Sequence, residues 1–127
     1  MKNICIFAHF NKNNNLEDYV IDYVNAIKEL VDEVIFVSTS EMKPSKVNLL
    51  QKIVSKIIIK ENKGYDFGSW KEGLFFVKNN YENLPKEIIL CNDSCYISEK
   101  LLKKAVSSMR NNKKIDFWGI TSNSTHL

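Results

Sequence analysis

Short apolar runs recur along this chain. Four of them lie at residues 4–8, 34–37, 57–59 and 88–90, and they predict strands at 4–8, 34–37, 56–60 and 87–91. Runs of this length without polar alternation are typical of strands that are buried on both faces of a parallel sheet. A further run at 115–121 predicts a last strand.

Segments with helical periodicity separate these runs. Between residues 16 and 31, seven apolar residues recur at three- and four-residue steps, which predicts a helix with one buried face. Further helices are predicted at about 45–53, 69–79 and 98–110. The residues expected on the inner side of the third helix are Trp70, Leu74, Phe75 and Val77.

The alternation of strands and helices predicts an α/β fold, a mainly parallel sheet with helices on both faces. In such sheets ligands bind beyond the carboxyl ends of the strands, where the strand order reverses. The segments that follow the predicted strands, 9–15, 38–41, 61–68 and 92–94, are all polar. This agreement predicts a ligand-binding cleft at that edge of the sheet.

The segment from Asn62 to Leu74 joins the third strand to the next helix and holds three of the four glycines. Glycine permits positive φ or the close approach of a ligand. Ser69, with Glu72 three residues on, predicts a capping box that opens the helix. A helix N-terminus behind a glycine-bearing turn suits a phosphate group. The alternative is a tight turn whose glycines serve packing alone.

Length, charge and cysteine content narrow the class of protein. The 127 residues fit one domain, and the net charge of +3 comes almost wholly from scattered lysines, with Arg110 the only arginine. A nucleic-acid-binding protein is therefore not expected. Cys5, Cys91 and Cys95 form no disulfide framework or zinc motif, which favours a reducing compartment. With no signal peptide and no apolar run of about 20 residues, a cytoplasmic protein without a transmembrane segment is expected.

Two motifs resemble the rhamnan synthesis protein F family. They are residues 62–68 (NKGYDFG) and residues 90–94 (LCNDS). Residues 4–10 (ICIFAHF), 37–40 (VSTS) and 116–121 (DFWGIT) are similar to further segments of that family. Its members are bacterial proteins of cell-surface polysaccharide assembly and are regarded as glycosyltransferases.

The resemblance implies a GT-A-like, Rossmann-like domain that binds a nucleotide-diphosphate sugar. It suggests dTDP-rhamnose as the donor, inversion as the stereochemistry, and a polysaccharide or lipid-linked acceptor. In GT-A enzymes the catalytic base and the acceptor site come from a later segment. Residues 1–127 are therefore interpreted as a single α/β domain, the N-terminal donor-binding portion of a larger glycosyltransferase. In that intact protein the expected location is cytoplasmic, peripheral at the inner face of the membrane. This portion is expected to bind the donor but not to catalyse sugar transfer by itself. No catalytic residue is assigned.

The resemblance also implies a set of binding residues. His9, Phe10 and Ser38 would border the base, and the glycine-rich turn would face the ribose and diphosphate, with Asp66 accepting from a hydroxyl group or the base. The complete expected set is His9, Phe10, Ser38, Asn62, Lys63, Gly64, Tyr65, Asp66, Gly68, Lys71, Asn92, Asp93 and Ser94.

Residues 92–94 stand where many GT-A enzymes carry an Asp-x-Asp motif, but here only Asp93 is acidic. Asp93 is the expected ligand of Mn²⁺ or Mg²⁺, which would offset charge on the diphosphate. One alternative is a metal-independent site, with Lys63, Lys71 and helix amides facing the phosphates. The other is that residues 92–94 form a loop that only caps its own backbone.

Two other classes of function remain. One is a non-catalytic nucleotide-binding or assembly module with the same fold. The other is an unrelated flavodoxin-like or receiver-like domain, which the loop after the first strand does not favour. Of the aromatic residues, Trp70 and Trp118 are expected in the core and Tyr65 at the surface. For His9 the pattern favours a hydrogen-bonded structural histidine over a catalytic base.

Overall fold

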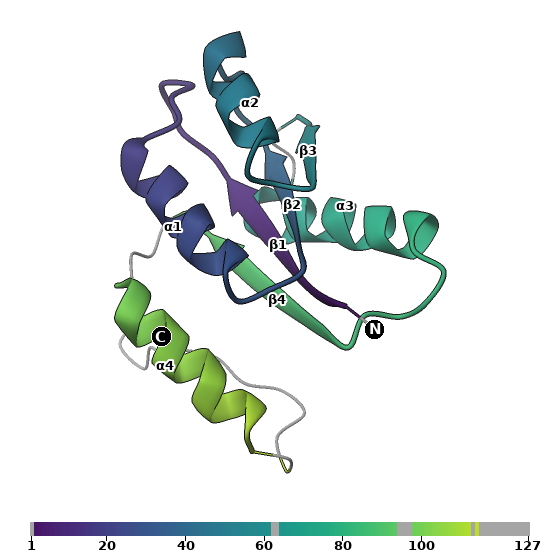
Figure 1. Ribbon diagram of the computed structural model, residues 1–127. Coiled ribbons are helices and arrows are strands. Elements are labelled where there is room, and N and C mark those ends of the chain that lie inside the picture. The colour runs from purple at the N-terminus through teal and green to yellow at the C-terminus, as the bar shows by residue number, and fades with distance from the viewer. Residues whose placement is uncertain (1, 62–63, 94–97, 113, 115–127) are drawn as a thin grey trace, which may run out of the picture. The chain divides into compact units, whose positions relative to one another are not determined.

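The computed structural model describes residues 2–61, 64–93, 98–112 and 114. These residues contain a four-stranded parallel sheet and four helices (Figure 1). The chain divides into two compact units, Met1–Tyr96 and Ile97–Leu127. The first holds the sheet and three helices, and the second holds the remaining helix. The predicted α/β class with a parallel sheet is confirmed.

The sheet has the strand order β3-β2-β1-β4. Its first strand therefore pairs on both sides, and the order reverses between β1 and β4. Each strand begins and ends within two residues of its predicted position, and the predicted strand at 115–121 lies outside the described residues. The strands are β1 (Asn3–His9), β2 (Glu33–Ser38), β3 (Lys56–Ile59) and β4 (Glu87–Asn92).

Helices of the first unit cover both faces of this sheet, as predicted. α1 and α2 lie on one face and α3 on the other (Figure 1). α3 carries the chain from β3 across β2 and β1 to β4, which is what reverses the strand order. The helices are α1 (Asp18–Lys28), α2 (Pro44–Gln51) and α3 (Tyr65–Asn80).

β1 is the buried centre of the sheet, as its apolar run predicted. Ile4 and Ile6 face α3 and pack in one cluster with Val77. Phe7 faces the other way, where its ring meets Tyr23 of α1 edge-on at 5.6 Å and stacks on Phe36 of β2 at 5.4 Å. Both layers of the core therefore depend on this strand.

α3 begins at Tyr65, so the predicted capping box at Ser69 and Glu72 is wrong. Ser69 is buried inside the helix, and the residue before the first helical residue is Gly64. Gly64 and Tyr65 have φ values of 77° and 51°. Through these two left-handed residues the helix begins about one turn earlier than the Ser-x-x-Glu pattern indicated. Most of the glycine motif, from Tyr65 onward, is therefore helix and not a long turn.

The buried residues of α3 are Ser69, Gly73 and Val77, which we call the inner seam. The prediction that Leu74 and Phe75 lie on the inner side is wrong, because they are 39% and 47% exposed. Small residues at four-residue spacing let the helix backbone come close to the sheet. The inner face is therefore set by the small side chains, not by the largest apolar ones. The predicted inward positions of Trp70 and Val77 are confirmed, Trp70 being partly buried against the core.

β4 is less buried than its continuous apolar run suggests. Ile88 and Leu90 are 38% and 46% exposed. The parallel register pairs them with Ile4 and Ile6, so they lie on the α3 side of the sheet. They stay exposed because α3 packs over β1 and β2.

The second unit contains α4 (Glu99–Arg110), close to its predicted bounds. The Ser98 hydroxyl caps this helix by accepting from the backbone N–H of Leu101 at 3.3 Å. Glu99 and Lys103 form an ion pair of 3.0 Å one turn apart. Across all the described helices, none combines the length and the apolar character that a membrane span requires.

The contact of Gly73 with β1 generates a prediction about stability. A Cβ atom at this position would overlap Cγ2 of Ile6, which is fully buried and cannot withdraw. We expect Gly73→Ala to lower the free energy of unfolding by about 1–3 kcal/mol, although alanine favours a helix by about 1 kcal/mol. Urea denaturation measures the change.

Asn79→Ala is the matched control, because Asn79 is exposed on the same helix. This variant should be neutral or slightly more stable. Equal stability of Gly73→Ala and the natural protein would contradict the close packing of α3 on β1.

Candidate functional site

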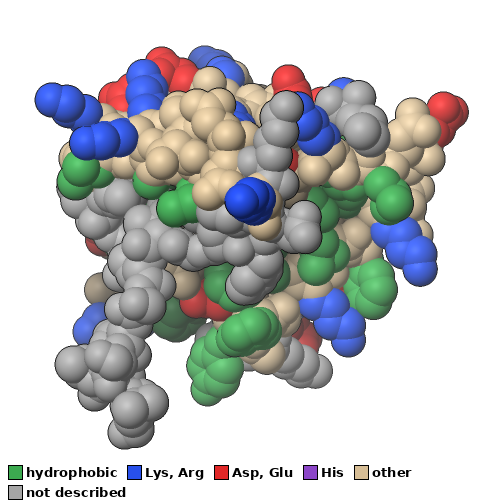
Figure 2. All heavy atoms as spheres, turned by 90° about the horizontal axis from the view of Figure 1, so that it is seen from below, with side chains coloured by type: hydrophobic (Ala, Val, Ile, Leu, Met, Phe, Trp, Pro, Cys, Tyr) green, Lys and Arg blue, Asp and Glu red, His purple; other side chains and the backbone are tan. Residues whose placement is uncertain are grey.

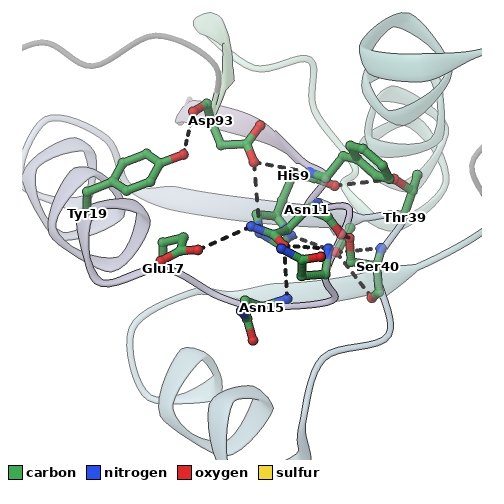
Figure 3. A network of polar contacts seen from close by, with 11 residues as sticks. His9, Asn11, Asn15, Glu17, Tyr19, Thr39, Ser40 and Asp93 are labelled. Atoms are coloured by element: carbon green, nitrogen blue, oxygen red, sulfur yellow. Dashed lines mark hydrogen bonds and ion pairs between the residues drawn. The ribbon is translucent and has the colours of Figure 1, made fainter.

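His9, Phe10 and Asp93 meet at the carboxyl edge of the sheet, where the strand order reverses. Ala8 pairs with Asn92 in the register of β1 and β4, so the residues that follow these two lie side by side. The backbone N–H of Phe10 donates to Oδ2 of Asp93 at 3.2 Å, and His9 Nε2 lies 3.9 Å from the same oxygen (Figure 3). Parallel α/β sheets bind ligands at this position.

The His9 ring is buried and only partly satisfied. Its Nδ1 lies 2.8 Å from Oγ of Ser38, which also accepts from the Ser40 backbone N–H at 3.1 Å. Its Nε2 has no hydrogen-bond partner within the described part of the chain. Burial lowers the pKa of His9 to about 4, and the backbone of Asn15 offsets part of this shift. The ring is therefore neutral near pH 7, with one buried nitrogen unpartnered.

Asp93 is a largely buried carboxylate, its side chain being 12% exposed. Burial raises its pKa, the nearby charge of Asp66 raises it further, and the Phe10 N–H opposes the shift. Among the described residues, no lysine or arginine forms an ion pair with Asp93 or Asp66. The site consequently carries negative charge without a cation from this part of the chain.

Two hydrogen bonds hold the first turns of α3 against the end of β4. The amide Nδ2 of Asn92 donates to Oδ2 of Asp66 at 2.9 Å, and the indole N–H of Trp70 donates to the Cys91 carbonyl at 2.8 Å. Asp66, Asn92 and Asp93 thereby share one edge. In the described chain no group of three or more His, Cys, Asp or Glu side chains could enclose a metal ion. Carboxylate and amide oxygens here suit a hard divalent cation that takes its remaining ligands from water and a phosphate.

The loop after β1 is fixed by a network that the sequence interpretation did not foresee. Oδ1 of Asn11 accepts the backbone N–H groups of Asn13 and Asn15 at 2.8 and 3.3 Å. The backbone N–H of Asn11 donates to Oγ of Ser40 at 2.8 Å, and the Ser40 hydroxyl donates to the Asn11 carbonyl at 3.0 Å (Figure 3). The Tyr19 hydroxyl donates to the Asp93 carbonyl at 3.1 Å. Asparagine is prone to such turns, but the cross-loop partners Tyr19 and Ser40 leave no local signal in the sequence.

The structure brings together six of the expected binding residues: His9, Phe10, Ser38, Asp66, Asn92 and Asp93. Gly64, Tyr65 and Gly68 belong to the N-terminal end of α3 beside Asp66, and Tyr65 is 79% exposed, as predicted.

Lys71 is turned elsewhere, with its Nζ 5.6 Å from the centroid of the outward Phe75 ring. The expected positions Asn62, Lys63, Ser94 and Trp118 lie outside the described residues.

The buried His9 ring predicts a pH-dependent stability. Its pKa is about 4 in the folded protein and near 6.5 when unfolded, so protons bind preferentially to the unfolded chain between these values. The free energy of unfolding should fall by up to about 3 kcal/mol as the pH drops through this window. In His9→Asn this contribution should be missing, which urea denaturation at a series of pH values measures.

The comparison of the two proteins isolates His9. Asp93 acts with the opposite sign, since its raised pKa favours the folded state when it takes up a proton, but it is present in both proteins. Parallel curves of stability against pH for the two proteins would show that His9 is not held neutral by burial.

Comparison with protein families gives one assignment. The family described as Rhamnan synthesis protein F matches residues 34–126. This range includes Asp66, Asn92 and Asp93, whereas the resemblance drawn for residues 4–10 lies outside it. Searches of curated proteins and of solved structures found no significant match. The chain belongs to the rhamnan synthesis protein F family, a family of polysaccharide biosynthesis.

Proposed function

We propose that this chain is the donor-binding domain of a glycosyltransferase of rhamnan synthesis. Its ligand would be a nucleotide-diphosphate sugar, with dTDP-rhamnose the donor that the family favours. The observation that carries the proposal is the position of Asp93. This carboxylate lies at the reversal of strand order, largely buried, facing an unpartnered nitrogen of His9.

Electrostatics favours a divalent cation as part of this site. A diphosphate carries negative charge, and so do the two carboxylates at the edge, Asp66 and Asp93. Mn²⁺ or Mg²⁺ between the diphosphate and these carboxylates would reduce the repulsion between their negative charges. It would also offset the charge that develops on the leaving diphosphate. Asp93 would be its main protein ligand, with an Asp66 or Asn92 oxygen beside it.

A metal-independent site receives less support from the described residues. The ammonium group of Lys71 lies over the Phe75 ring on the outward side of α3. The first turn of α3 also contains Asp66, whose charge opposes a phosphate at that helix N-terminus. The proposed diphosphate position is therefore at Asp93 instead of against the amides of α3.

The remaining residues of the site would recognise the nucleoside. His9, Phe10 and Ser38 come from the ends of β1 and β2, and the loop network around Asn11 and Ser40 fixes them before a ligand arrives. A preorganised loop lowers the entropic cost of binding. In this proposal the base lies beside the β1 loop and the diphosphate reaches toward Asp93.

Calorimetric titration with dTDP, UDP and GDP, each with and without Mn²⁺, tests the proposal. We expect saturable binding of one diphosphate that is stronger with Mn²⁺. Asp93→Asn should weaken it by about tenfold or more, because a charged ligand contact is lost. Asp66→Asn should weaken it less, since Asp93 is the main protein ligand in this proposal and Oδ2 of Asp66 already accepts from Asn92.

Asp32→Asn is the matched control. Its Oδ2 also accepts a backbone N–H, that of Asn3 at 2.8 Å, but at the opposite, amino edge of the sheet. Its binding should equal that of the natural protein. A folded protein that binds none of the three diphosphates would contradict the proposal and favour a non-catalytic assembly module with the same fold.

A further inference from the structure

The outward side of α3 carries large apolar side chains that the described residues leave well exposed. Phe67, Leu74 and Phe75 are 81%, 39% and 47% exposed. They lie away from the inner seam by which the helix packs on the sheet. A helix that covers a sheet needs one apolar face, so packing does not explain the second one.

Two lysines stand among these apolar side chains. Lys71 is one helical turn from both Phe67 and Phe75, and Lys78 is one turn from Leu74. Nζ of Lys71 lies 5.6 Å from the centroid of the Phe75 ring, so the stem of this side chain follows the apolar surface. We call these five residues the apolar–basic face.

The acidic residues of α3 lie outside this face. Asp66 is bonded to Asn92 at the end of β4, and Glu72 is one turn before Phe76, which packs on the core. Figure 2 shows one side of the molecule on which, at the right of the view, hydrophobic side chains lie among lysine or arginine side chains. The apolar–basic face therefore combines exposed apolar area with positive charge.

We propose that the apolar–basic face of α3 binds the surface of an anionic lipid bilayer. Phe67, Leu74 and Phe75 would enter the boundary between headgroups and acyl chains. Lys71 and Lys78 would extend to the lipid phosphates, because long cationic side chains keep their charge at that level while their stems stay apolar. Each lysine near an anionic membrane adds to the attraction.

The charges disfavour a second copy of the chain as the occupant. A symmetric dimer brings the same patch of both subunits together. Such a contact through this face would place Lys71 and Lys78 of one copy against those of the other, and like charges repel. An anionic surface meets the same two lysines with opposite charge.

Vesicle co-sedimentation of the full chain tests the inference without any nucleotide, so its result is independent of the proposed function. The probes are phosphatidylcholine vesicles with and without phosphatidylglycerol. We expect binding to the anionic vesicles that weakens as salt is added. The double variant Phe67→Ala/Phe75→Ala should weaken it by about tenfold or more. Lys71→Gln/Lys78→Gln should weaken it by roughly 30-fold.

Matched controls separate this face from the basic character of the whole chain. Lys28→Gln/Lys52→Gln removes the same charge from exposed positions at the ends of α1 and α2. Leu49→Ala removes an apolar side chain that is 40% exposed on α2. Both controls should bind as the natural protein does, and circular dichroism confirms that every variant is folded.

Three results with vesicles would overturn the inference. They are no sedimentation with anionic vesicles, equal sedimentation with uncharged ones, and a loss in the control variants as large as in the α3 variants. A concentration-dependent dimer that Phe67→Ala/Phe75→Ala abolishes would also overturn it, in favour of contact between copies of the chain.

Discussion

The register of β1 against its two neighbours is the constraint on which the rest of the structure depends. It pairs His9 with Ser38 on one side and Ala8 with Asn92 on the other. The Ser38 contact of the His9 ring and the Asp93 contact of the following backbone N–H both result from these pairings. A slip of one residue would turn every β1 side chain to the opposite face and would bury polar groups instead. The apolar core therefore enforces the geometry of the candidate site.

The inner seam of α3 is the second element that shapes the site. Gly73 lets the helix backbone approach β1, and the same packing presents Asp66 and Trp70 to the end of β4, where they bond to Asn92 and to the Cys91 carbonyl. Close packing on small residues leaves the larger apolar side chains of α3 on its outward side. One helix thus contributes a carboxylate to the candidate site on one side and exposes the apolar–basic face on the other.

Strand positions could be predicted from the sequence because each strand is a short apolar run between polar loops. The start of α3 could not, because Gly64 and Tyr65 enter the helix through left-handed backbone that no periodicity reveals. The partial exposure of β4 could not be predicted either, since this strand has the composition of a central strand although α3 contacts it only at its carboxyl end. The motif residues Asp66 and Asp93 indicated the site, but their partners come from distant segments. Tyr19 and Ser40 reach the site only through the tertiary fold.

The central claim is that a nucleotide diphosphate binds at the reversal of strand order, beside Asp93. Nuclear magnetic resonance with dTDP and Mn²⁺ tests it most directly, because a paramagnetic ion broadens the amide signals of the residues around it. The account predicts that the signals of Phe10, Asp66 and Asp93 broaden first, and that those of Asn3 and Asp32 at the opposite edge stay sharp. Signals that stay sharp throughout, or broadening centred on the amino edge of the sheet, would contradict it.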